Sequence, residues 1–329
     1  MILKKETSII TFGDFLDIYH KIRQNGMKYL ISNLRLSHKG RVTSKWDFYE
    51  SSSDFWIIPE IEQDWNERIS GDKNVAYEDY VAQKYFSGKE GLRILSVGCG
   101  EGAHERSLAR YRSVSKIIGV DISEGSIAKA RSLAGKENLP IEYMAGDFFK
   151  MNFEHESFDV ILFSSSLHHF QDISNFLKNN IRPLLKEGGL LVAFEYCGPN
   201  RLQWRGSALK EANRLLYQLP EKFRMLYDGR TLKRKVYRPG TIRMLLVDPS
   251  EAPDSINLVK AIHDNFTVVE EVKLGWNLLV LLLKGIAHNF VTDDPEVKTI
   301  LASLLEEEKR YESATGENNH IFGVYRKNA

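Results

Sequence analysis

A glycine-rich stretch, Ser96-Val97-Gly98-Cys99-Gly100-Glu101-Gly102-Ala103, follows directly after a short apolar run. Glycines let a chain turn sharply after a strand, approach a ligand closely and begin a helix whose N–H groups face that ligand. Asp121 ends the next apolar run, roughly 20 residues further on, where a carboxylate can accept hydrogen bonds from both hydroxyls of an adenosine ribose. A tight turn alone would also use glycines, but the two features together indicate an adenosine-binding site.

The blocks that follow bear on the kind of cofactor. Gly98, Gly100 and Ala103 satisfy the relaxed Gly-x-Gly-x-x-Gly/Ala pattern of nicotinamide-binding folds. The block Ala145-Gly146-Asp147-Phe148 and the turn Lys186-Glu187-Gly188-Gly189 argue against that assignment. An acid at the end of a strand, such as Asp147, could bond the amino group of an adenine, or it could cap the helix that follows.

Two histidines, His168 and His169, follow the fourth apolar run and the serines 164–166. Open α/β sheets bind ligands at this end of their strands, and a histidine there could act as a general base for a hydroxyl acceptor. Successive strand residues point to opposite faces, so we expect at most one of the pair to face the acceptor. We favour His169, and packing or capping is the alternative. No set of residues with metal-ligand spacing surrounds the pair, so we expect no metal.

Short apolar runs and amphipathic segments alternate around these residues. The runs are Ile94–Val97, Ile117–Val120, Ile141–Met144, Val160–Phe163 and Leu190–Phe194, and the helix candidates between them are Ala103–Tyr111, Glu124–Ala134 and Ile173–Leu185. We expect Ser123 and Asp172 as N-caps, with Gly135 and Gly188 following the helices. Two more strands are expected at Phe266–Val272 and Ile321–Tyr325. The pattern predicts an α/β fold with a Rossmann-like, doubly wound, mostly parallel seven-stranded sheet.

The chain is expected to divide into four consecutive segments: a helical N-terminal extension (1–75), a cofactor-binding core (76–198), a cap or substrate-binding insertion (199–255) and the C-terminal part of the core (256–329). The extension is basic, and it either packs on the domain or faces an anionic partner. The insertion begins where the alternation of strands and helices stops. Its basic residues could clamp a carboxylate or phosphate, or form a solvated loop.

The overall composition excludes several classes of function. The 329 residues include 45 Lys or Arg and 44 Asp or Glu, for a net charge of +1, so general coating of nucleic acid is not expected. Two cysteines, Cys99 and Cys197, cannot form a disulfide framework. Without a signal-peptide core or an apolar run of about 20 residues, we expect a soluble, cytoplasmic protein with no transmembrane segment.

The order and spacing of these blocks resemble the class I S-adenosylmethionine-dependent methyltransferases, of the bacterial methyltransferase-domain type, over Leu92 to about Phe194. The resemblance implies S-adenosylmethionine as the cofactor. It implies that Gly98, Cys99, Gly100, Gly102, Asp121, Ile122, Asp147, Phe148 and Ser164 bind the cofactor. Among them, Gly98 and Gly100 would line the methionine moiety, Asp121 the ribose, and Ile122, Asp147 and Phe148 the adenine. One departure is Ser96, where the family usually has Asp or Glu before the glycines.

The stretch from Glu195 to Trp204 is similar to bacterial methyltransferases of unassigned substrate, and this implies Tyr196, Arg201 and Trp204 as substrate-binding residues. His168 and His169 are the catalytic candidates. No Asn/Asp-Pro-Pro-Tyr/Phe motif follows the fourth run, as amino-group methylases of nucleic acid and glutamine have, and no Pro-Cys nucleophile of cytosine methylases is present.

We therefore expect methyl transfer to an oxygen or nitrogen atom of a small metabolite. The alternatives are a sugar or glycan, a lipid or an RNA nucleotide as acceptor. Other classes are an NAD-dependent oxidoreductase and a non-catalytic module that binds S-adenosylmethionine. DNA is not an expected partner, and a homodimer is left open.

Overall fold

The structure is a computed structural model that describes residues 7–15 and 55–327, in two units. We call residues 66–197, 252–273 and 320–327 the sheet unit, and the described residues up to 65 together with 198–251 and 274–319 the helical unit. The units interleave along the chain, whereas we expected four consecutive segments. Those segments remain a prediction, and most of the N-terminal extension lies outside the described residues.

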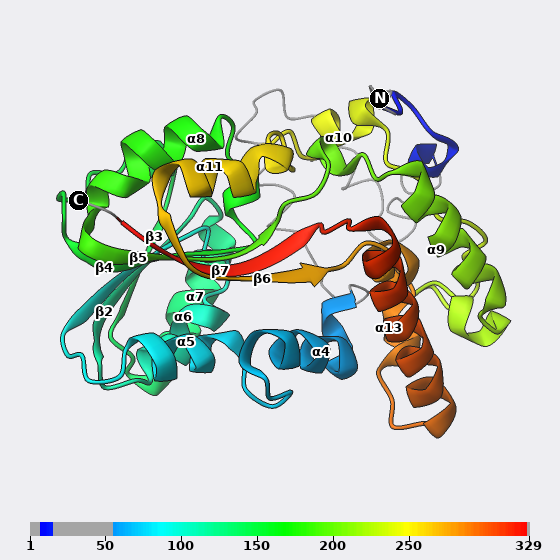
Figure 1. The fold of residues 1–329 in the computed structure, drawn as a ribbon, viewed down its shortest axis with the longest axis horizontal. Coiled ribbons are helices and arrows are strands. Elements are labelled where there is room, and N and C mark those ends of the chain that lie inside the picture. Colours follow the sequence, from blue (N-terminus) through cyan, green and yellow to red (C-terminus); the bar gives the residue numbers. More distant parts are fainter. Residues whose placement is uncertain (1–6, 16–54, 328–329) are drawn as a thin grey trace. The chain divides into compact units, whose positions relative to one another are not determined.

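A seven-stranded sheet forms the centre of the sheet unit (Figure 1). Its strands are β1 (Leu92–Val97), β2 (Val114–Asp121), β3 (Ile141–Ala145), β4 (Phe158–Ser164), β5 (Leu185–Tyr196), β6 (Thr267–Gly275) and β7 (His320–Arg326), in the order β3-β2-β1-β4-β5-β7-β6. The pairs among β1 to β5 are parallel, and β7 is antiparallel to β5. The mostly parallel, seven-stranded sheet expected from the sequence is confirmed.

Helices cover both faces of this sheet. Figure 1 shows α8 (Ile173–Phe176) and α11 (Leu258–Asn265) on one face, with α5 (Tyr77–Tyr85), α6 (Ala103–Ala109) and α7 (Glu124–Glu137) on the other. Strands buried from both sides need apolar side chains at nearly every position. Ile94, Leu95 and Ile161 are accordingly fully buried. The doubly wound arrangement follows from that composition.

The helix caps agree with expectation at two positions and differ at two. The Ser123 side chain accepts the N–H of Ser126, and Asp172 accepts that of Asn175. The expected end at Gly135 is wrong, because α7 continues to Glu137 and Asn138 ends it in the left-handed conformation (φ 51°). Gly188 is also not a cap, since it lies inside β5. The helical run before it ends in a 3-10 turn, Arg182–Leu184, that contains a proline.

The helical unit contains α9 (Gly206–Gln218), α10 (Thr241–Val247), α12 (Leu279–Leu283) and α13 (Pro295–Thr315); α4 (Pro59–Ser70) begins in this unit and ends in the sheet unit. Glu308 of α13 is buried, and its carboxylate accepts the N–H groups of Asn277, Leu278 and Leu279 where α12 begins. A buried carboxylate thus caps a very short helix. Within the part of the chain that the structure describes, no helix has the length and apolar character needed to cross a bilayer.

Candidate active site

The glycine-rich loop after β1 turns through three residues with positive φ: Gly98 (76°), Gly100 (52°) and Gly102 (75°). A Cβ on Gly98 would lie 2.5 Å from the Cβ of Ser166, and one on Gly102 would lie 2.1 Å from the hydroxyl of Tyr143. These two glycines are therefore needed for close packing as well as for their backbone conformation. Beside Gly100, a Cβ would meet no atom within 4 Å among the described residues. Open space at the loop is thus next to Gly100.

Asp121, at the end of β2, is tied to this loop. Its Oδ2 accepts the N–H of Gly100 at 2.9 Å, and its Oδ1 accepts that of Ser123 at 2.8 Å. The structure therefore brings Asp121 to the loop, and its binding to a ribose remains a prediction. Each carboxylate oxygen has two lone pairs, so both oxygens can accept further hydrogen bonds. Ile122, the next residue, is half-buried.

Asp147 and Phe148 follow β3. Asp147 accepts the N–H of Phe149 at 3.1 Å and so caps the 3-10 turn Phe148–Lys150. The Phe148 ring packs 5.7 Å from Phe176 and 5.9 Å from Phe153. Capping was one of the two interpretations of Asp147, and a bond from this acid to adenine remains a prediction.

Two carboxylates, which the sequence pattern did not indicate, contact residues next to the glycine loop. Oε1 of Glu105 accepts the hydroxyl of Ser96 at 2.5 Å. Both residues are buried, and burial raises the pKa of the Glu105 carboxyl. Oε1 of Glu78 lies 2.5 Å from Nδ1 of His104. The departure at Ser96 was the signal that could have prompted a search for an acid in the helix that follows.

Ser164, an expected cofactor ligand at the end of β4, accepts the hydroxyl of Tyr77 at 3.1 Å. The Tyr77 ring stacks on Phe194 with a centroid separation of 5.1 Å and an interplanar angle of 6°. Burial raises the pKa of the Tyr77 hydroxyl, which keeps it a hydrogen-bond donor. Ser164 is therefore held by a neighbour in α5, which the sequence did not indicate.

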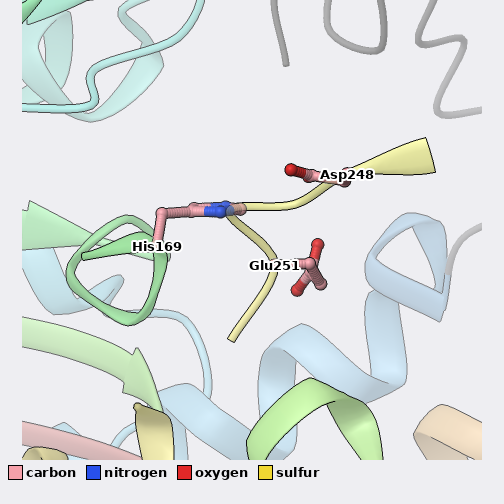
Figure 2. Close-up of side chains that lie close together, drawn as sticks. All are labelled: His169, Asp248 and Glu251. Carbon is pink, nitrogen blue, oxygen red and sulfur yellow. The ribbon is translucent and has the colours of Figure 1, made fainter. Parts of the chain in front are cut away.

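His168 and His169 lie on a 3-10 turn, Leu167–His169, rather than on the strand. The expectation that they point to opposite faces rested on strand geometry and does not apply to this turn. His168 is buried, with its Nδ1 2.7 Å from Oε2 of Glu195. His169 is half-buried, and its ring centroid lies 4.4 Å from that of His168. Figure 2 shows the His169 side chain projecting from this turn.

Of the expected substrate-binding residues, only Tyr196 belongs to the sheet unit. Its buried ring stands edge-on to His168 at 6.0 Å. Arg201 and Trp204 belong to the helical unit. There, Nη1 of Arg201 donates to the backbone oxygens of Pro249 and Glu251.

Within the helical unit, the carbonyl of Trp204 accepts Nε of Arg238. Asp248 and Glu251 follow α10 in the same unit, and Figure 2 labels both. Oδ1 of Asp248 accepts the N–H and the hydroxyl of Ser250. The substrate roles of Arg201 and Trp204 remain predictions.

Both cysteines are free thiols. Burial raises the pKa of Cys99, in the glycine loop, far above its ordinary value, and it raises that of Cys197 to about 12. Since the thiolate is the nucleophilic form, neither thiol is prepared for nucleophilic catalysis near neutral pH. Cys99 is therefore a packing residue of the loop.

Residues 95–193 match a family model described as a methyltransferase domain. A sterol 24-C-methyltransferase of Gibberella zeae is 29% identical over 129 residues, which are 39% of this chain and 33% of that protein. A ubiquinone biosynthesis O-methyltransferase of Bradyrhizobium diazoefficiens is 36% identical over 102 residues, which are 31% of this chain and 39% of that protein. The solved structure of an S-adenosylmethionine-dependent methyltransferase from Mesorhizobium loti has 18% identity and a TM-score of 0.44, with 76% of this chain and 98% of that chain covered. The chain spans 33% and 39% of the length of these two curated relatives.

Proposed function

We propose that this chain, whose residues 95–193 match the model of a methyltransferase domain, is a class I enzyme that transfers a methyl group from S-adenosylmethionine to an oxygen or nitrogen atom of a small metabolite. The observation that supports this most strongly is the glycine loop, which has open space beside Gly100 and is tied to the carboxylate of Asp121. The bound cofactor supplies an already activated methyl group. The protein then needs mainly to align the acceptor with it.

The residues of the sheet unit fit this cofactor in charge and shape. Gly98, Cys99, Gly100 and Gly102 offer backbone groups to the methionine moiety, and there is open space beside Gly100. Asp121 offers acceptors to the ribose hydroxyls. Ile122 and Phe148 offer apolar surface to adenine, with Asp147 as an acceptor for its amino group. Ser164 completes the set that we propose. Each assignment rests on the position of the residue at the end of a parallel strand or in the loop that follows it.

For a hydroxyl acceptor, we propose His169 as the general base, with His168 as the second candidate. His168 is held by Glu195 at 2.7 Å, and the two rings lie 4.4 Å apart. Tyr196, Arg201 and Trp204 are the proposed contacts to the acceptor, and residues 199–255 are the proposed cap.

A lipid acceptor is the second candidate, and the names of the sterol and ubiquinone-pathway relatives favour it. The regions matched to these relatives are 129 and 102 residues long. We further propose a cytoplasmic location. We also propose that the protein does not bind DNA, which the net charge of +1 supports. A homodimer is proposed as the assembly to test first.

Calorimetry tests the cofactor assignment directly. We expect S-adenosylhomocysteine, the demethylated product, to bind and to raise the melting temperature as its concentration rises. NAD should bind more weakly or not at all. Tighter binding of NAD than of S-adenosylhomocysteine would overturn the proposal. Transfer of a labelled methyl group to hydroxyl, amine and lipid acceptors then separates the acceptor classes.

A further inference from the structure

The strand β1 lacks the acid that the resemblance leads one to expect before the glycines, since Ser96 stands there. The structure brings another acid to the same place. The hydroxyl of Ser96 donates to Oε1 of Glu105 at 2.5 Å, and the two residues are only 2% and 1% exposed. Glu105 belongs to the first turn of α6. Its side chain therefore contacts Ser96 near the end of β1.

The second oxygen of this carboxylate, Oε2, is buried and has no hydrogen-bond partner among the described residues. His104, which interacts electrostatically with Glu105, is paired with Glu78 at 2.5 Å. A buried carboxylate oxygen without a partner is costly, and such a cost is offset when a cation or a strong donor binds. The feature therefore points to a cationic ligand group.

We propose that Glu105 recognises the ammonium group of the methionine moiety of the cofactor, with Ser96 as the residue that positions its carboxylate. This proposal rests on the proposed function, and it deepens the assignment of the same site. The glycine loop connects β1 to α6, and the resemblance assigns the same loop to the methionine moiety, so Ser96 and Glu105 lie at the two ends of the segment that would line this moiety. In this proposal, the acid that the family usually has on the strand is supplied by the helix instead.

The test compares two ligands that share the adenosine and the sulfur. S-adenosylhomocysteine carries the chain with the ammonium and carboxylate groups, whereas 5′-methylthioadenosine has a methyl group in place of that chain. In calorimetry, Glu105→Gln should weaken S-adenosylhomocysteine by about tenfold or more, as expected for loss of a charge-assisted bond. The affinity for methylthioadenosine should stay within about twofold of the wild-type value.

Two further variants control the result. Glu101→Gln changes an exposed acid of the same loop that pairs with Lys129, and it should leave both affinities unchanged. Glu105→Ser should bind S-adenosylhomocysteine weakly, and adding Ser96→Asp should restore most of the affinity by returning the acid to the strand. Circular dichroism verifies the fold of each variant.

The outcomes are distinct. Unchanged binding of S-adenosylhomocysteine by folded Glu105→Gln would overturn the proposal, and so would an equal loss for both ligands, which indicates a purely structural role. If wild-type protein binds neither ligand, the proposed function itself fails.

Discussion

Oε2 of Glu195 lies 2.7 Å from Nδ1 of His168, and the exposed fractions of the two side chains are 0% and 8%. Oε1 of the same carboxylate accepts the N–H groups of Ser166 and Leu167 at 2.7 and 2.6 Å. One side chain at the end of β5 thus holds both the backbone of the turn after β4 and the His168 ring. The position of His168 therefore depends on a residue 27 positions later in the chain.

Glu195→Ala should lower the free energy of unfolding by about 3 kcal/mol or more, because buried donors of the turn lose their acceptor. Urea unfolding followed by circular dichroism measures this change. Glu187→Ala replaces an exposed glutamate of the same strand, and its effect should stay within about 0.5 kcal/mol. A loss of less than about 1 kcal/mol for Glu195→Ala would show that the turn does not need this carboxylate.

His169→Ala should lower kcat by about 10²–10⁴-fold if His169 is the general base, with cofactor affinity unchanged. Steady-state rates on an acceptor found by the labelled-methyl assay, together with calorimetry of the cofactor, provide the two readouts. His155→Ala, which removes an exposed histidine before β4, is the matched control. A loss of less than about tenfold would mean that alignment alone carries the reaction, which the chemistry of a sulfonium permits.

Asp121→Ala should weaken the cofactor, because the ribose hydroxyls lose a charged acceptor. Each such bond contributes about 1.5–3 kcal/mol at most. The N–H groups of Gly100 and Ser123 lose their acceptor as well, so the loop should also become less ordered. Calorimetry of S-adenosylhomocysteine and proteolysis of the free protein measure the two effects separately. Full affinity in the variant would remove Asp121 from the site.

Gly100→Val should abolish cofactor binding, because the new side chain fills the space beside the loop and strains a residue at φ 52°. Gly88→Val is the matched control, since Gly88 also has positive φ (71°) and open space, but lies between α5 and β1. Both variants should lose similar stability in thermal unfolding, and only Gly100→Val should lose the ligand. Equal binding by the two variants would place the methionine moiety elsewhere.

The affinity for S-adenosylhomocysteine should rise with pH between about 4.5 and 7, where an α-amino group stays protonated. Burial raises the pKa of the Glu105 carboxyl in the free protein above its ordinary value, and only its ionised form can pair with an ammonium group. Rising pH ionises the carboxyl and so favours binding.

The other titratable groups that interact electrostatically with Glu105 are Tyr77, Glu78, Cys99, His104 and Tyr143. Glu105→Gln removes only the contribution of Glu105, so the difference between the two calorimetric pH profiles isolates it. Parallel profiles would exclude Glu105 as the partner of the ammonium group.

Local patterns in the sequence were sufficient to identify the first five strands of the sheet. The apolar runs marked β1 to β5 because strands covered on both faces need apolar residues at nearly every position. Ser123 and Asp172 could be recognised as caps because a cap acts within three residues of itself. The predicted end of the helix at Gly135 was wrong, because Asn138 can also adopt the left-handed conformation that ends a helix.

The candidate site was predictable only in part. Asp121 can be selected as a candidate from the sequence because it stands at the end of a predicted strand. Glu105 can be selected only from the structure, because its contact with Ser96 forms when α6 packs against β1. Glu195 was visible in the sequence, and its bonds to the turn after β4 depend on the pairing of two strands. The 3-10 turn at Leu167–His169 has no periodic pattern that a short sequence window could reveal.

The cap that Glu308 places on α12 has a consequence for the order of folding. A five-residue helix such as Leu279–Leu283 is not stable by itself in water. The N–H groups where it begins donate to the carboxylate of Glu308, which is up to 31 residues later in the chain. During synthesis, α12 therefore leaves the ribosome before its cap does. Until α13 has also emerged, the apolar side chains of Leu279–Leu283 are exposed to chaperones and to other nascent chains.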